Sequence, residues 1–292
     1  HKIEEIDERI SKNGKIIKKL NYYKVKSLLK KNFALGIRAI SITLINSFKF
    51  PKHEKIIHSI ATEIGYKYIS CSYNVCPMIN YTSRGYTTTA DTYLNPVIKN
   101  FTNKVTNKVS ELFTSSEINY MQSSGFLSKR KNFSGKSSIL SGPAGGVNAG
   151  IYLAKLNNIK EVIGFDMGGT STDVWHFAGE VEKRLETKIS GIYLKSPVLN
   201  IDSIAAGGGS EINYKQKRFI VGPNSAGAYP GPTCYRNNGP LTITDCNLIL
   251  GRITPDFFLS ILEKKEIKKY LKNFQKKSFC NYLKRYKKII PQ

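Results

Sequence analysis

The sequence has no uninterrupted apolar run that approaches the roughly 18 residues of a membrane-spanning helix, and no secretory signal is visible in it. Its five cysteines form no C-x-x-C pair, and their number is odd. This pattern predicts free thiols in a reducing compartment such as the cytosol. Acidic residues are scarce. The sequence contains 21 Asp and Glu but 45 Lys and Arg, which gives a formal net charge of +24.

Such an excess of basic charge would ordinarily indicate nucleic acid or an anionic membrane as a partner. Here the lysines are spread along the whole chain beside many Asn and Ile, without an Arg-rich stripe or an RNA-binding signature. We interpret the charge as a compositional bias, which disfavours nucleic acid and membrane. The densest cluster, Lys264 to Lys288, leaves open a basic helix that binds one of them, against a solvated helix with an ordinary packed face.

The length of 292 residues suits about two domains, and 40% hydrophobic residues suffice for packed cores. The first half alternates helical and strand patterns, which predicts an α/β fold. The predicted helices are 22–35, 51–64 and 89–109, the predicted strands are 37–45, 66–71 and 118–122, and loops are predicted at 74–89 and 123–138.

The stretch from Val162 to Val174 reads V-I-G-F-D-M-G-G-T-S-T-D-V. An apolar run ends at Asp166, the pair Gly168 and Gly169 breaks it, and a second apolar stretch begins at Asp173. This pattern predicts a strand, a tight turn and a strand. A dinucleotide or Walker-type loop fits worse, because a helix would have to follow the glycines.

A turn of this kind suits a phosphate group. Its glycines allow a close backbone approach and its N–H groups can converge on one anion, while the hydroxyls of Thr170, Ser171 and Thr172 add donors. Asp166 could hold a Mg²⁺ ion through water, because Mg²⁺ takes few carboxylates and keeps much of its hydration. A hairpin with a Gly-Gly turn and no ligand remains the alternative from these residues alone.

A second glycine turn strengthens the phosphate hypothesis. The predicted strand 197–204 leads directly into Gly207, Gly208, Gly209 and Ser210, so that two turns could hold two parts of one nucleotide. Before the first turn, residues 140–157 predict a Gly- and Ala-rich helix whose bare surface suits close packing, with a flexible linker as the alternative. The remaining predictions are strands at 181–188 and 217–221, a Pro-Gly loop at 222–232, and a helix at 242–252 capped by Thr244 or Asp245.

Several motifs occur together and in order: F-D-M-G-G-T-S-T-D-V, L-S-G-P-A-G-G-V, A-A-G-G-G-S, V-G-P-N-S-A-G-A-Y-P-G-P-T-C-Y and G-P-L-T-I-T-D-C-N-L-I-L-G-R. This combination resembles the hydantoinase A and 5-oxoprolinase family. The earlier stretches F-P-K-H-E, P-M-I-N-Y-T-S-R-G-Y-T-T-T-A-D-T-Y-L-N-P and C-Y-R-N-N-G-P-L-T look most like its ATP-dependent 5-oxoprolinases. The resemblance runs from about Ile3 to about Pro255, and only the Lys-rich tail falls outside it.

The resemblance implies the actin-like ATPase fold of acetate and sugar kinases, Hsp70 and actin, here in part, with the nucleotide in a cleft between two α/β domains. It implies that Asp166 to Thr172 is the second phosphate loop, that Gly207 to Ser210 face the adenosine, and that the helix from Pro143 connects the domains. Asp166, Thr170 and Asp173 are then the candidate catalytic residues, with Asp173 orienting Thr170 or a water. Arg84 and the loop 227–232 are weaker candidates, for which a structural role fits equally well.

The chemistry implied by the resemblance is the ATP-driven opening of 5-oxo-L-proline to L-glutamate in glutathione metabolism, with ATP and Mg²⁺, and K⁺ as a further candidate ion. An N-methylhydantoinase-like or acetone-carboxylase-like enzyme and an inactive basic fragment are the alternatives. The family's first phosphate loop is absent and the chain begins with His1, so we expect a fragment of an enzyme that is a candidate homodimer when intact. Its predicted segments are 1–139, the end of the N-terminal domain; 140–255, the ATPase domain; and 256–292, a Lys-rich helical tail.

Overall fold

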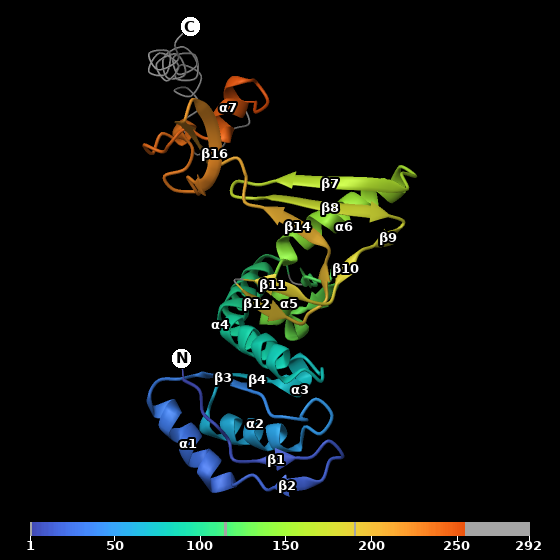
Figure 1. Cartoon of the computed structure of the whole chain (residues 1–292), viewed down its shortest axis with the longest axis vertical. Helices are drawn as coiled ribbons and strands as arrows, with labels where there is room; N and C mark the ends of the chain where they lie inside the picture. Colours follow the sequence, from blue (N-terminus) through green and yellow to red (C-terminus); the bar gives the residue numbers. More distant parts are fainter. Residues whose placement is uncertain (1, 114–115, 190, 255–292) are drawn as a thin grey trace. The chain divides into compact units, whose positions relative to one another are not determined.

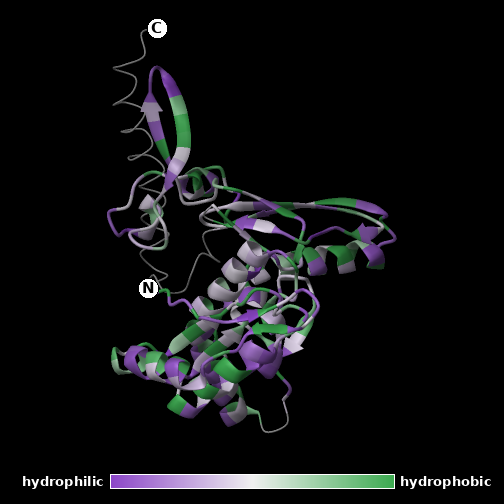
Figure 2. Ribbon diagram, turned by 60° about the horizontal axis from the view of Figure 1, so that its bottom comes forward, coloured by the Kyte–Doolittle hydropathy of each residue, from purple (hydrophilic) through white to green (hydrophobic). Residues whose placement is uncertain are grey.

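The structure, a computed structural model, describes residues 2–113, 116–189 and 191–254 (Figure 1). The chain divides into two compact units. The first comprises His1–Val162 and His176–Asn200, and the second comprises Ile163–Trp175 and Ile201–Gln292. Within the elements of both units, hydrophobic and hydrophilic residues alternate along the ribbon, as expected for helices and strands with one packed face (Figure 2).

The first unit begins with an α/β layer. Its elements are β1 (Arg9–Ile10), β2 (Ile16–Lys18), α1 (Tyr22–Ala34), β3 (Ala39–Ile42), α2 (Lys52–Ile64) and β4 (Tyr68–Cys71). Strands β3 and β4 pair in parallel with α2 between them in the chain, which is the predicted α/β pattern. Asn21 caps α1 by accepting from the Lys24 amide at 3.0 Å, and Gly65 ends α2 in the left-handed conformation, with φ at 104°.

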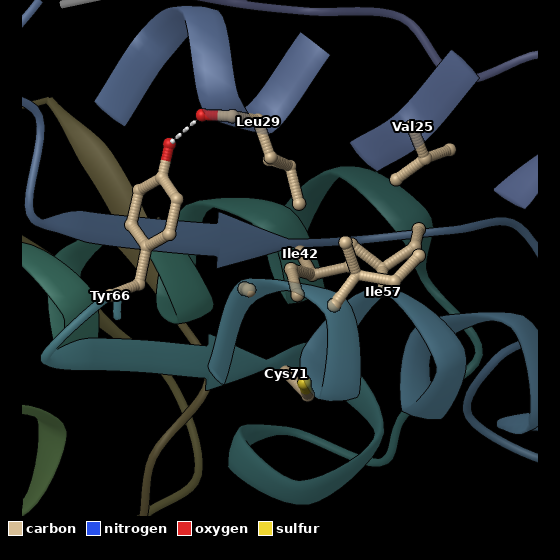
Figure 3. Packing of buried hydrophobic residues seen from close by; sticks show 8 residues of the cluster. Val25, Leu29, Ile42, Ile57, Tyr66 and Cys71 are labelled. Carbon is tan, nitrogen blue, oxygen red and sulfur yellow. Dashed lines mark hydrogen bonds between the residues drawn. The ribbon is translucent and has the colours of Figure 1, made fainter. Parts of the chain in front are cut away.

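The hydrophobic core of this layer lies where α1 and α2 meet the two strands. Val25 and Leu29 come from α1, Ile57 from α2 and Ile42 from β3, and all are buried (Figure 3). The hydroxyl of Tyr66 donates to the carbonyl oxygen of Leu29 at 2.9 Å, which satisfies the polar end of a buried ring.

The helix α4 (Tyr81–Leu112) is longer than the sequence predicts, and α3 (Ser72–Val75) precedes it. The prediction of a loop over 74–89 is wrong in its second half. Asn80 caps α4 by accepting from the Ser83 amide at 3.0 Å. The hydroxyls of Thr87 and Thr88 each donate to the carbonyl oxygen four residues earlier, at 2.7 Å, so hydroxyl-rich sequence that suggested a loop is accommodated inside a helix.

The rest of the first unit consists of the helix α6 and several short elements. They are β5 (Asn119–Met121), β6 (Leu127–Lys129), a 3₁₀ turn (Arg130–Asn132), α5 (Gly135–Ser138), α6 (Ser141–Leu156), β9 (Glu180–Val181), β10 (Lys183–Arg184), β11 (Thr187–Ile189), β12 (Ile192–Leu194) and β13 (Val198–Leu199). The strand predicted over 181–188 is therefore divided among three short strands. The side chain of Asn148 in α6 donates to the carbonyl oxygen of Gly125 at 2.6 Å, so α6 packs in this unit.

The second unit contains most of β7 (Glu161–Met167), most of β8 (Thr172–Ala178) and all of β14 (Ile201–Ile204), in the sheet order β14-β8-β7. The other elements are the hairpin β15 (Ser210–Lys215) and β16 (Arg218–Ser225), a 3₁₀ turn (Thr233–Tyr235) and α7 (Ile243–Ile249). The cap of α7 is Thr242, not the predicted Thr244 or Asp245, because the Thr242 side chain and the Asp245 carboxylate form a capping box.

Both units mix helices and strands, which confirms the predicted α/β class. Over the described part of the chain, no helix is long and apolar enough to cross a membrane. Four cysteines, Cys71, Cys76, Cys234 and Cys246, are free thiols. The segment Lys264 to Lys288 lies outside the described residues.

Candidate phosphate-binding site

The predicted strand, turn and strand are present in the second unit. Strand β7 ends at Met167 and β8 begins at Thr172, so the turn consists of the four residues from Gly168 to Ser171. The amide of Gly168 donates to the carbonyl oxygen of Ser171 at 2.9 Å and closes the turn. Asp166, near the end of β7, and Thr170, in the turn, are both exposed.

The turn leaves a run of backbone donors available. Within the described residues, no acceptor is found for the N–H groups of Gly169, Thr170 and Ser171. A Cβ added to Gly169 would meet no atom of the described residues within 4 Å, so this part of the chain leaves room there for a ligand. Successive free amides in a turn are a typical anion-binding arrangement.

The second glycine loop packs directly on this turn. The amides of Gly208 and Gly209 donate to the carbonyl oxygens of Gly168 at 2.9 Å and Gly169 at 2.6 Å. A Cβ on Gly207 would lie 2.7 Å from the carbonyl carbon of Gly169 and from the amide nitrogen of Thr170. Glycine at position 207 is therefore required by backbone packing alone, whether or not a ligand binds.

Two of the predicted hydroxyl donors already bond within the chain. The hydroxyl of Thr172 donates to the carbonyl oxygen of Ala206 at 2.5 Å, and that of Ser210 accepts from the Gly207 amide at 2.9 Å. Both residues are buried. The hydroxyls of Thr170 and Ser171 have no such partner among the described residues, so these two are the ones that a ligand could use.

Two further segments bond to the glycine loops, and no sequence pattern predicts either contact. The amide of Ala226, from the predicted Pro-Gly loop, donates to the carbonyl oxygen of Gly209 at 2.8 Å. The amide of Thr244, in the first turn of α7, donates to the carbonyl oxygen of Gly208 at 2.7 Å. The turn is thus backed by layers of backbone hydrogen bonds that come from distant parts of the sequence.

The two candidate carboxylates lie on neighbouring strands. Asp166 belongs to β7, and Asp173 belongs to β8, where it is half-buried opposite Ser203 of β14. No hydrogen bond between Asp173 and Thr170 is found in the described residues. No group of three or more His, Cys, Asp or Glu side chains that could hold a metal occurs there either. A hydrated Mg²⁺ needs fewer, because one or two carboxylates and the phosphates of a nucleotide suffice.

Arg84, the weaker candidate, belongs to the first unit and is fully buried. Its guanidinium donates to the carbonyl oxygens of Met78 at 2.7 Å and Leu44 at 2.6 Å, and to the hydroxyl of Ser72 at 3.0 Å. Of the two roles that the sequence left open, these contacts favour the structural one.

The fold and the paired glycine loops agree with a comparison against family models. Residues 84–281 match the hydantoinase/oxoprolinase model, and residues 1–65 match the hydantoinase/oxoprolinase N-terminal region. The chain belongs to the hydantoinase/oxoprolinase family. The match reaches residue 281, beyond Pro255, where the motif-based resemblance ended.

Individual relatives are much longer than this chain. It is 47% identical over 255 residues to the 5-oxoprolinase of Saccharomyces cerevisiae, which covers 86% of this chain and only 20% of that protein. Among solved structures, nucleotide-free acetone carboxylase, from a study of ATP-dependent acetone carboxylation, has a TM-score of 0.73 at 28% identity, over 87% of this chain and 37% of its own. The ATP-dependent caprolactamase of Pseudomonas jessenii has a TM-score of 0.69 at 28% identity, over 85% and 37%.

Proposed function

We propose that the turn from Asp166 to Thr172 binds a phosphate group of ATP, in an enzyme that hydrolyses 5-oxo-L-proline to L-glutamate. The observation that carries the proposal is the run of N–H groups at Gly169, Thr170 and Ser171 that have no acceptor in the described chain. The space above Gly169 is not filled by described atoms, and the carboxylate of Asp166 nearby in the sequence is exposed. Membership of the hydantoinase/oxoprolinase family and the identity with a 5-oxoprolinase support the choice of reaction. Because the chain spans about a fifth of that relative, the activity belongs to a longer enzyme.

An actin-like ATPase fold is the architecture that we propose for the intact enzyme. In this proposal Gly207 to Ser210 face the adenosine and the helix α6 connects two domains, within the segment 140–255. Gly142 and Gly145 of α6 support a connecting role, because a Cβ at either would have no described atom within 4 Å and the helix surface there can be approached closely.

The proposed reaction depends on positioned hydrogen-bond donors more than on covalent steps, because phosphoryl transfer is catalysed chiefly by orientation and charge neutralisation. The amides of Gly169, Thr170 and Ser171 would hold phosphate oxygens, with the hydroxyls of Thr170 and Ser171 beside them. Mg²⁺, when bound with ATP, would neutralise phosphate charge, and the exposed Asp166 suits it as a carboxylate that binds through water. Asp173 would orient Thr170 or a water molecule.

A carboxylase-like or hydantoinase-like reaction is the second candidate. It is favoured by the TM-score of 0.73 with acetone carboxylase. Both reactions would use ATP to activate an oxygen atom of the substrate, so the same turn serves either, and only the organic substrate distinguishes them. Phosphate release assayed with 5-oxoproline, a hydantoin and acetone in parallel would separate the two.

The proposed function is tested by nucleotide titration of the ¹⁵N-labelled chain. We expect MgATP to shift the amide resonances of Gly169 to Ser171, and Asp166→Asn to weaken binding in Mg²⁺ but not in EDTA. Asp202→Asn is the matched control, because Asp202 is another exposed aspartate of the same sheet. Identical shifts and affinities for the wild type, Asp166→Asn and Asp202→Asn would contradict the role of Asp166, and no shift at all would contradict the phosphate site.

ATP hydrolysis is a separate question. With the family's first phosphate loop absent from this sequence, we expect the 292-residue chain alone to show little or no ATPase activity. Robust phosphate release that depends on 5-oxoproline would contradict that expectation.

A further inference from the structure

We propose that Asp245 is a positioning residue for the phosphate-binding turn, which it controls from a distance through a relay of backbone hydrogen bonds. The inference rests on the proposed function of that turn. Asp245 does not contact the turn; it fixes the start of α7, and α7 holds the glycine loops on which the turn is built.

The Asp245 carboxylate is fully buried and accepts several hydrogen bonds. It accepts from the amides of Thr233 at 3.2 Å and Cys234 at 2.8 Å, and from the amide and hydroxyl of Thr242 at 2.8 and 2.9 Å. A buried carboxylate with several such bonds is held in one orientation. Asp245 therefore joins the 3₁₀ turn at Thr233 to the first turn of α7.

The relay begins at Thr244, one residue before Asp245. Its amide belongs to the first turn of α7, where N–H groups have no partner within the helix. It donates to the carbonyl oxygen of Gly208 at 2.7 Å. A Cβ on Gly208 would lie 2.6 Å from the Thr244 hydroxyl oxygen, so the two segments touch and α7 cannot shift without moving the loop.

From Gly208 the relay passes through whole peptide groups. The peptide group that contains the Gly208 carbonyl also contains the Gly209 amide, which donates to the carbonyl oxygen of Gly169 at 2.6 Å. The peptide group of that carbonyl contains the Thr170 amide, one of the amides without an acceptor in the described chain. A parallel bond from the Gly208 amide to the Gly168 carbonyl oxygen, at 2.9 Å, ends in the same way at the free amide of Gly169.

This arrangement has an electrostatic consequence. A carbonyl group that accepts a hydrogen bond polarises its peptide group, which makes the N–H of the same group a stronger donor. The amides of Gly169 and Thr170 are both polarised in this way, and because neither has an acceptor in the described chain, both are available to a ligand. Asp245 thus fixes the position of the two amides that the proposed function gives to a phosphate, and through the relay from Thr244 it also sets the donor strength of the Thr170 amide.

Two pairs of variants of the full 292-residue chain test this inference at a temperature well below unfolding. Asp245→Asn places an amide where four donors converge, and its control is Asp91→Asn. Asp91 is also a buried aspartate with three hydrogen bonds, to Ser70, Asn95 and Lys136, but it lies in the first unit without a bond to the glycine loops. Thr244→Pro removes the relay's first N–H, and its control Thr244→Ala keeps that N–H and loses the hydroxyl and the methyl group of the side chain.

Without nucleotide, we expect Asp245→Asn and Thr244→Pro to move the amide proton resonances of Gly169 and Thr170, while both control variants leave them unchanged. With MgATP, the same two variants should raise the Kd about fivefold or more, the order expected for one weakened hydrogen bond. A merely structural role would lower the melting temperature of Asp245→Asn and Asp91→Asn alike and leave these resonances and the Kd in place, which would overturn the inference. If MgATP does not bind the wild-type chain, the proposed function fails first, and a positioning role for Asp245 falls with it.

Discussion

Gly164 on β7 leaves the space that the indole ring of Trp175 on β8 occupies. A Cβ added to Gly164 would lie 1.8 Å from Cε2 of Trp175, far inside van der Waals contact. Trp175 is buried, at 8% exposure, and it is the single tryptophan of the sequence. Its fluorescence therefore reports on the strand pair that carries the glycine turn.

Gly164→Ala should displace this ring. We expect a loss of about 1–3 kcal/mol of stability, as for overpacked cores, and a red shift of the emission as the indole meets water. Gly145→Ala is the control, because Gly145 lies in the middle of a helix and an added Cβ there would meet no atom of the described chain within 4 Å. That control should leave the emission unchanged and stabilise the chain by about 0.5–1 kcal/mol. Equal emission spectra for the two variants would show that the contact is not made.

We expect substitution by alanine to affect stability differently at Gly207 and at Gly169. Gly207→Ala forces a Cβ against the backbone of Gly169 and Thr170 at 2.7 Å, so it should destabilise the second unit by about 1–3 kcal/mol in urea unfolding. The added Cβ of Gly169→Ala meets no described atom within 4 Å, so the stability of this variant should stay within about 0.5 kcal/mol of the wild type. A loss of MgATP affinity in Gly169→Ala at unchanged stability would therefore report a phosphate close to Gly169. Unchanged affinity would argue against that position of the ligand.

The sequence predicts the glycine turn because its pattern is local. An apolar run that ends at Asp166, two glycines and a second apolar run leave few alternatives to a strand, a turn and a strand. The bonds from Gly208, Ala226 and Thr244 could not be predicted in this way, because they join backbone atoms from separate loops and depend on no side-chain type. The role of Asp245 was hidden for a similar reason: the Thr233 and Cys234 amides that donate to its carboxylate come from a separate segment and become its neighbours only in the fold.

The start of α4 shows how composition can mislead. Three consecutive threonines, Thr87 to Thr89, suggested a loop, because hydroxyl side chains compete with helical hydrogen bonds. In the structure, Thr87 and Thr88 bond to carbonyl groups of their own helix, and Asn80 provides the cap. The burial of Thr87 and Thr88 within the first unit outweighs the weak preference of threonine against helices.

Glu54 anchors the polar network around Arg84 and should be intolerant of substitution. It is fully buried, and its carboxylate accepts from the Leu44 amide at 2.8 Å, the Ser72 hydroxyl at 2.6 Å and the Tyr73 amide at 3.2 Å. Glu54→Gln replaces an acceptor by a donor and should cost about 3 kcal/mol in urea unfolding.

The control for Glu54→Gln is Glu63→Gln. Glu63 forms an ion pair with Lys26 at 2.5 Å on the surface of the same unit, and solvent screens this pair. We expect no measurable change in the free energy of unfolding for it. Similar losses for the two variants would show that burial of Glu54 does not determine its contribution.

Strand β7 presents an apolar face that the described part of the chain does not cover. Ile163, Phe165 and Met167 alternate along one side of the strand and are 76%, 70% and 41% exposed. Phe165→Ser should therefore change stability by no more than about 0.5 kcal/mol, while it lowers the tendency of the chain to aggregate at high concentration. Light scattering while the wild type and Phe165→Ser are concentrated measures this tendency to aggregate. Phe177→Ser, at a position that is 2% exposed, should unfold the chain instead.

Alkaline pH should weaken the core of the first unit through Cys71. Burial, reinforced by the nearby Glu54 carboxylate, raises the pKa of the Cys71 thiol from an ordinary value of 9.0 to about 12. The unfolded chain loses this proton near pH 9, whereas the folded chain keeps it until about pH 12. Between these values the unfolded state binds fewer protons, so the free energy of unfolding falls as pH rises; below pH 9 the contribution is complete.

Urea unfolding between about pH 8 and 10 would measure this loss before most lysines titrate. Cys71→Ala creates a cavity and lowers stability at every pH, but it removes the titrating thiol, so its stability should fall less steeply with pH than that of the wild type. Cys246→Ala is the control, because its thiol is only half-buried and should contribute a smaller part of the slope. Parallel curves for the wild type and Cys71→Ala would mean that the Cys71 thiol is not protected from ionisation, and that water reaches the strand ends where β4 meets α2.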